Sequence, residues 1–141
     1  MLNNLDLNQL SYNALRLSII GAPKIFISGP VSKYNDDTVA LQIFEKAEKN
    51  LRAHIKDGKT FNNGDIKFDV DNIEIINPVK LNMQLKSYDT MDWGDFMSFG
   101  LFILNQCDYI YMLDDWQSSE GAKMEKLFAD KSGKIDELSM D

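Results

Sequence analysis

The segment from Asp114 to Glu125 holds the residues whose types and spacing best fit chemistry. Ser118 or Ser119 is a good N-cap for a following helix, and the free N–H groups of a helix start favour a phosphate or a carboxylate. Gly121 and Glu125 are four residues apart, so they share one helix face. A glycine one turn before a glutamate leaves open space above the carboxylate, where a ligand can reach it. Alternatively, Glu125 is solvated and Gly121 only permits close packing of the helix.

A second candidate loop begins where the apolar, β-branched run 24–28 ends, with Ser28, Gly29 and Pro30. Gly29 lets backbone N–H groups approach an anion closely, although a tight strand-to-helix turn explains the same residues. Tyr34 is a further candidate for the wall of a pocket here. Trp116 is either a ligand wall or a packing residue.

Composition excludes several classes of protein. The chain has 141 residues and a net charge of −7, from 15 Lys and Arg against 22 Asp and Glu. This balance argues against nucleic acid and anionic membranes as partners, because both attract clustered cations. One cysteine and one histidine allow neither an internal disulfide nor a zinc site. The sequence shows neither a signal peptide nor an apolar span of about 20 residues, so we expect a cytoplasmic protein. We also expect that it holds no metal and no cofactor.

Hydrophobic patterning predicts the elements that must position these residues. Three strands are expected at 24–28, 73–76 and 109–113, and helices at 38–55, at 92–106 and from 118–121 onward. This alternation predicts an α/β fold with a parallel sheet flanked by helices. In such a sheet, ligands bind beyond the carboxyl ends of the strands, which selects the loops 28–34, 77–82 and 114–121.

The remaining segments are expected to lie outside this core. Residues 1–22 are expected to form an N-terminal arm with a helix near 7–17, and residues 23–141 the domain itself. An insertion at about 57–71 carries turn signals and a small edge strand at 66–68. Residues 79–91 are expected to be a loop, and the tail after Gly133 to be short. His54 is expected on the solvated side of the first helix, and Trp93 in the core.

Several motifs together resemble a known family. They are Lys24–Pro30, Asn77-Pro78, Trp93 with Met97, and the run from Cys107-Asp108 through Trp116, Ser119 and Gly121 to Glu125. This pattern resembles the DUF4406 family, which occurs in bacteria and phages and looks like a branch of the nucleoside 2-deoxyribosyltransferase superfamily. The resemblance covers roughly residues 24–130 and leaves out the arm and the insertion.

The resemblance implies a flavodoxin-like or Rossmann-like fold and cleavage of an N-glycosidic bond in a nucleoside or nucleoside 5′-monophosphate. By its position four residues after Gly121, Glu125 would be the nucleophile. Ser119 would bind the phosphate together with backbone groups of residues 29–32. Related proteins tend to complete their pockets with a neighbouring subunit, so a homo-oligomer is expected. The substrate-binding residues would be Ser28, Gly29, Pro30, Tyr34, Asp114, Trp116, Ser119 and Gly121.

One departure from the superfamily pattern concerns a second acidic group. The superfamily carries an aspartate eight residues before the position of Asp108, and this chain has Gly100 there. Either Asp95, Asp114 or Asp115 replaces it, or catalysis is weak or absent. The alternative function is therefore a protein that binds and sequesters a nucleotide-derived signal of the ADP-ribose type, as in phage anti-defence. A third hypothesis is an interaction module that docks through the arm.

Overall fold

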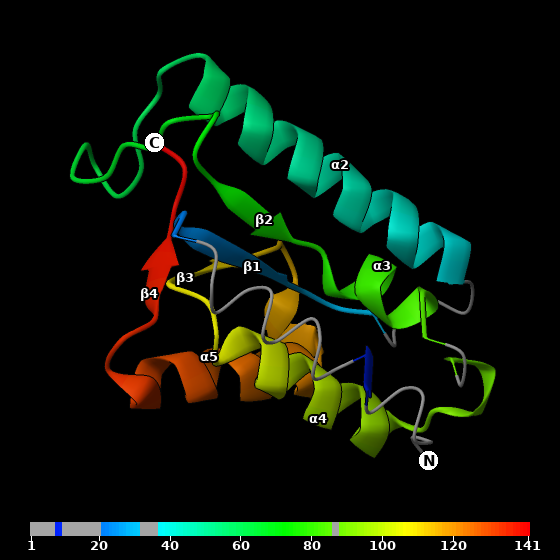
Figure 1. Cartoon of the computed structure of the whole chain (residues 1–141). Coiled ribbons are helices and arrows are strands. Elements are labelled where there is room, and N and C mark those ends of the chain that lie inside the picture. The colour runs from blue at the N-terminus through cyan, green and yellow to red at the C-terminus, as the bar shows by residue number, and fades with distance from the viewer. Residues whose placement is uncertain (1–7, 10–20, 32–36, 86–87) are drawn as a thin grey trace.

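The chain folds into a four-stranded, all-parallel sheet with helices on both faces, as predicted (Figure 1). The computed structural model describes residues 8–9, 21–31, 37–85 and 88–141. The expected helix near 7–17 lies almost entirely outside the described residues. The strands are β1 (Lys24–Ser28), β2 (Glu74–Ile76), β3 (Tyr109–Met112) and β4 (Asp136–Leu138), in the spatial order β2-β1-β3-β4.

Strand β1 lies at the centre of the sheet and is buried along its whole length. It pairs with β2 and with β3, and Phe26 stands level with Ile76 on one side and Ile110 on the other. A continuous apolar run suits this place, because helices cover the sheet on both faces. Alternate side chains therefore enter two different cores. Ile25 and Ile27 belong to one core, and Phe26 belongs to the other.

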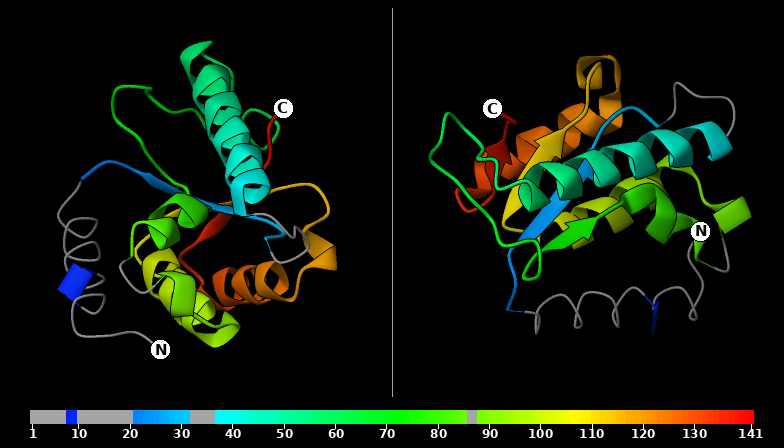
Figure 2. Two further views of the ribbon diagram at one scale, coloured as in Figure 1. Left: turned by 90° about the vertical axis from the view of Figure 1, so that its right-hand side faces the viewer. Right: turned by 90° about the horizontal axis from the view of Figure 1, so that it is seen from above.

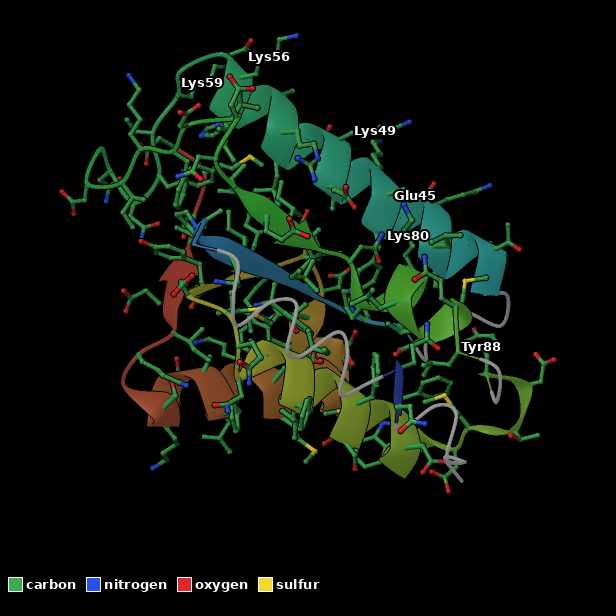
Figure 3. All side chains as sticks on the ribbon, in the orientation of Figure 1. Glu45, Lys49, Lys56, Lys59, Lys80 and Tyr88 are labelled. Carbon is green, nitrogen blue, oxygen red and sulfur yellow. The ribbon has the colours of Figure 1, made fainter. Side chains whose placement is uncertain are left out.

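The two faces are covered by different helices, which gives the doubly wound arrangement (Figure 2). Helix α2 (Asp37–Lys56) packs on one face through Phe44 and Leu51. Helices α4 (Trp93–Leu104) and α5 (Glu120–Ser132) pack on the other. Lys49 and Lys56 lie on the side of α2 that is turned away from the sheet (Figure 3). Among the described residues, none of the helices has the length and apolarity of a membrane span.

Local capping fixes where the helices near the site begin. Asp92 forms a capping box with Asp95 at the start of α4. The Ser119 side chain accepts a hydrogen bond from the Ala122 N–H and starts α5, as one of the two predicted caps. Helix α3 (Pro78–Met83) starts from the Asn77 cap with proline in its first turn.

Three expectations about the periphery were wrong, and one strand was not expected. The expected loop 79–91 holds α3 and the 3-10 turn η1 (Tyr88–Thr90). The tail after Gly133 adds strand β4 to the sheet. The insertion has no strand at 66–68, only bridges from Phe61 to Ile66 and to Met140. His54 is buried instead of solvated, because the insertion folds back over the end of α2 and brings the Thr60 carbonyl to 2.6 Å from its Nε2.

Candidate functional site

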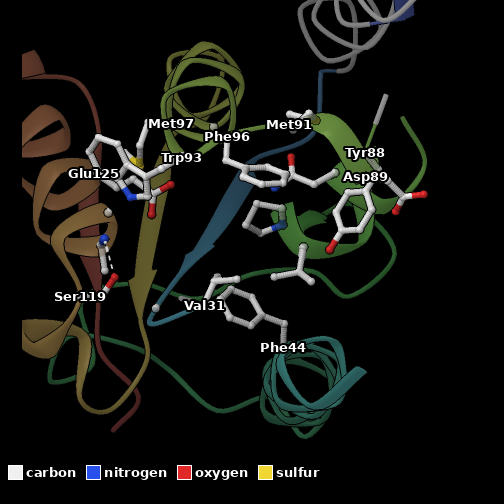
Figure 4. A pocket seen from close by; sticks show the side chains of 17 residues that line it. Val31, Phe44, Tyr88, Asp89, Met91, Trp93, Phe96, Met97, Ser119 and Glu125 are labelled. Atoms are coloured by element: carbon white, nitrogen blue, oxygen red, sulfur yellow. Dashed lines mark hydrogen bonds between the residues drawn. The ribbon is translucent and has the colours of Figure 1, made fainter. Parts of the chain in front are cut away.

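A cavity of about 470 Å³ opens at the carboxyl ends of the strands (Figure 4). The chain leaves β1 to form β2 on one side of it and later returns to form β3 on its other side. Parallel sheets bind ligands at such a switch point, because the loops on either side diverge there. Gly29 after β1, Pro78 after β2 and Ser119 after β3 all line the cavity. The volume lies within the range of small-molecule sites.

Glu125 is the acidic side chain at the inner end of this cavity. The Ser28 hydroxyl, itself fully buried, donates a hydrogen bond of 2.7 Å to its Oε1. Burial raises the pKa of Glu125 from 4.5 to about 7, although the Ser28 hydrogen bond acts in the opposite direction. The carboxyl is therefore poised to change charge near neutral pH, which is the property expected of a reacting group.

Gly100 on α4 faces the Glu125 carboxylate. A methyl group built on Gly100 would lie 3.1 Å from Glu125 Oε2, so the glycine supplies the space that the carboxylate occupies. The resemblance drawn from the sequence implies an aspartate at this position, whereas no acidic side chain of α4 lines the cavity.

The suggested replacements for that aspartate lie elsewhere. Asp95 is engaged in the capping box of α4, and neither Asp114 nor Asp115 lines the cavity. The second carboxylate of the cavity wall is Asp89 on η1, which is exposed and lies across the cavity from Glu125 (Figure 4). Within the described parts of the chain, no three His, Cys, Asp or Glu residues form a cluster that could hold a metal ion.

The start of α5 lies beside Glu125 and contributes Ser119 and Gly121 to the cavity wall. Ser119 is buried, and its Oγ caps the Ala122 N–H at 3.2 Å. A methyl group on Gly121 would lie 3.1 Å from Met97 Sδ and 4.0 Å from Trp93 Nε1. The space over Gly121 is therefore occupied by side chains of α4, which differs from the open space expected from the sequence. Glu125 itself lines the cavity, so a ligand in the cavity reaches the carboxylate without passing over Gly121.

Gly29 is required by a close contact between strand ends. A methyl group there would lie 2.8 Å from Leu113 Cβ, which follows β3. This contact accounts for the glycine, whereas the sequence had suggested a tight turn, and Gly29 lines the cavity as well.

Three other expected substrate-binding residues, Pro30, Asp114 and Trp116, lie outside this cavity. Pro30 and Asp114 line a separate hollow of about 290 Å³ together with Lys46 and Tyr111. Trp116 lines neither hollow, and the Lys126 ammonium lies 5.8 Å from the centre of its ring. Tyr34 lies outside the described residues. The structure therefore brings together Ser28, Gly29, Ser119, Gly121 and Glu125, and places the described candidates Pro30, Asp114 and Trp116 elsewhere.

Sequence analysis missed much of the opposite wall. Trp93, expected in the core, is half exposed and lies beside Glu125 at the cavity (Figure 4). Asn82 and Tyr88 come from the segment expected to be a loop. The Asn77-Pro78 pair, a cap followed by proline, was the available signal for a helix that carries Asn82 to this wall.

A comparison with protein families matches the chain to the model described as "Domain of unknown function (DUF4406)" over residues 23–135. The chain therefore belongs to the DUF4406 family. No curated protein matches it. No solved structure matches it either.

Proposed function

We propose that this protein cleaves the N-glycosidic bond of a nucleoside or a nucleoside 5′-monophosphate, with Glu125 as the nucleophile. The observation that carries the proposal is the Glu125 carboxylate, which sits in a cavity wall and is held by the Ser28 hydroxyl at 2.7 Å. A positioned carboxylate of this kind suits attack on an anomeric carbon through an oxocarbenium-like transition state.

The reaction balances without a cofactor. A carboxylate oxygen of Glu125 bonds to the anomeric carbon as the bond to the base nitrogen breaks, and the base leaves with the electron pair and takes a proton from solvent. Water then attacks the anomeric carbon of the sugar ester and gives up a proton to solvent, which releases the sugar and restores the Glu125 carboxylate. A second base attacking in place of water gives transfer instead of hydrolysis.

A 5′-phosphate would be held at the start of α5. The backbone N–H groups there point out of a 13-residue helix, and an anion at a helix start is stabilised by their partial positive charge. Ser119 adds its hydroxyl and lies at the same end of the cavity as Glu125 (Figure 4), and Gly29 also lines the cavity.

The test is release of free base from a panel of nucleosides and nucleoside 5′-monophosphates, followed by chromatography. Glu125→Gln keeps the shape but cannot form the ester, so we expect at least a thousandfold loss of release. Glu48→Gln on α2 is the matched control, because Glu48 pairs with Arg52 at the surface and lines neither of the two hollows found in the described part of the chain. Release that survives in Glu125→Gln would remove Glu125 as the nucleophile.

Gly100 favours a second candidate function, a protein that binds a nucleotide-derived ligand without turnover. No acid faces Glu125 from α4, so the leaving base has no protein proton donor on that side. Calorimetry separates the two functions, since tight binding with no base released supports the second.

A further inference from the structure

The charged side chains in the described wall of the cavity are carboxylates. Asp89 and Glu125 lie across the cavity from each other (Figure 4), and the described lining residues include no lysine, arginine or histidine. A cleft lined by charges of one sign attracts ligands of the opposite sign, because its walls of low dielectric constant focus the field. The cavity therefore favours a ligand that carries a positive charge.

Aromatic side chains in the same wall add to this attraction. The cavity is lined by the rings of Phe44, Tyr88, Trp93 and Phe96. The Trp93 side chain is 50% exposed, and the Tyr88 ring meets the Phe96 ring edge-on, with centroids 5.8 Å apart. The faces of aromatic rings attract cations, and flat ligands pack against them. A flat cationic ring therefore gains more from this wall than a neutral ring of the same shape.

The residue at position 100 bears on the kind of base that can leave. No acidic side chain of α4 lines the cavity, so α4 supplies no carboxylic acid to protonate a departing base. A neutral purine or pyrimidine leaves with an extra electron pair and needs a proton, which a general acid usually provides. A base that is already cationic leaves as a neutral molecule, because the electron pair of the broken bond cancels its charge.

We propose that the substrate is a nucleoside, or its 5′-monophosphate, whose base is a positively charged heteroaromatic ring of the pyridinium or N7-alkylpurine type. The cleavage step rests on the proposed function, whereas the preference for a cationic ring rests on the cavity alone. A carboxylate oxygen of Glu125 bonds to the anomeric carbon, the bond to the ring nitrogen breaks, and the base leaves uncharged. Water then hydrolyses the ester and gives up a proton to solvent, so the departing base needs no acid.

The cationic ring also acts on Glu125 itself. Burial holds the pKa of this carboxyl at about 7, so near neutral pH it is only partly ionised. A positive charge close to a carboxyl group favours its charged form. The substrate thus holds Glu125 in the form that attacks the sugar.

The first experiment measures recognition without bond cleavage. The probes are 1-methylnicotinamide and 3-methylbenzamide, which have the same shape and differ in the charged ring nitrogen that replaces a carbon. Neither has a glycosidic bond, so the protein cannot consume them. In titrations of the wild-type protein followed by NMR of the ligand, we expect the cation to bind about tenfold more tightly than the neutral ring.

Variants then assign this preference to the cavity. Asp89→Asn removes one carboxylate from the wall, so the preference should fall about threefold. Asp57→Asn is the matched control, because it removes the same charge at an exposed position that lines neither hollow. It should leave the preference unchanged, and circular dichroism establishes that both variants are folded.

The second experiment measures cleavage. Release of base from 7-methylguanosine and from guanosine is followed by chromatography, and each rate is divided by the rate without protein, because the cationic base leaves more readily by itself. We expect the enhancement for 7-methylguanosine to exceed that for guanosine by about tenfold or more, since only guanosine needs a general acid.

The outcomes separate this inference from the proposed function. Equal binding of the two probes, no binding of either, or a preference that both variants reduce equally overturns the recognition of a cationic ring. A preference without release of any base supports that recognition and contradicts the proposed cleavage. An enhancement for guanosine that equals or exceeds the one for 7-methylguanosine supports the proposed cleavage and overturns the inference.

Discussion

Glu125 and Asp141 are two carboxyl groups whose surroundings act in opposite directions. Glu125 lies in the wall of a cavity, receives one hydrogen bond from Ser28, and has a pKa raised to about 7 by burial. Asp141 is exposed, and its carboxylate accepts hydrogen bonds from the Thr60 hydroxyl and from the N–H groups of Asn63 and Gly64. These bonds lower the pKa of Asp141.

The difference separates a group that supports the fold from one suited to chemistry. Asp141 fastens the insertion to the end of the chain, where the Asn62 side chain also bonds to the Glu137 carbonyl and the Ser139 N–H. Its charged form is satisfied. The charged form of Glu125 is poorly satisfied, which costs stability and leaves a carboxylate able to react.

The largest expected effect is on stability as a function of pH. Folded Glu125 holds its proton up to about pH 7, while the unfolded chain releases it near 4.5, so the contribution of this group to stability falls as pH rises through that window. Across this whole pH window, the contribution of Glu125 to the free energy of unfolding falls by about 3 kcal/mol. Denaturant unfolding of wild type and Glu125→Gln between pH 4 and pH 8 measures it. A gap between the two proteins that does not change with pH would contradict the raised pKa.

A methyl group at position 100 should reduce activity more than stability. In Gly100→Ala the new carbon lies 3.1 Å from Glu125 Oε2, so the carboxylate must shift by a few tenths of an ångström. We expect base release to fall on the order of tenfold. Alanine also favours the helix by about 0.5–1 kcal/mol, so unfolding should show no loss. Unchanged release would mean that the position of this carboxylate does not matter.

Removing the hydrogen bond from Ser28 to Glu125 should enlarge the contrast between Glu125 and Asp141. Ser28→Ala leaves burial unopposed and should raise the pKa of Glu125 further, by about one unit. The pH at which base release reaches half its maximum should then move upward, and release at pH 7 should fall about fivefold. Ser98→Ala, at an exposed position of α4, is the control. A pH profile that does not move argues against control of the reaction by this hydrogen bond.

The smallest expected effect belongs to Asp141. Its lowered pKa means that the carboxylate supports the fold above the unfolded pKa and that this support is lost as pH falls through the folded value. Asp141→Asn should lower the melting temperature slightly at pH 7, and this deficit should shrink in acid. Base release should stay at the wild-type level. A large loss of release would show that the insertion communicates with the cavity.

The sequence predicted the end of the site that holds Glu125 better than the opposite end. Ser119, Gly121 and Glu125 lie within seven residues of one helix start, so helical spacing alone relates them. The bond from Ser28 to Glu125 joins residues 97 positions apart, and only the pairing of β1 with β3 brings them together.

The errors at the periphery have the same origin in tertiary contacts. Strand β4 has three residues and exists because it pairs with β3, so its pattern was too short to recognise. Trp93 shares a helix face with Met97, which suggested a core position, but the first turn of α4 lies at the open cavity. His54 is covered by the insertion, whose path the sequence of α2 does not indicate.

The central claim is tested most directly by trapping the sugar on the protein. A 2-fluoro nucleoside slows hydrolysis of the ester, so mass spectrometry of the intact protein and of its peptides can locate the attached sugar. The account predicts a mass increase of one fluorinated sugar on Glu125, and none in Glu125→Gln. Release of base with no attached sugar, or a sugar attached to another residue, would contradict it.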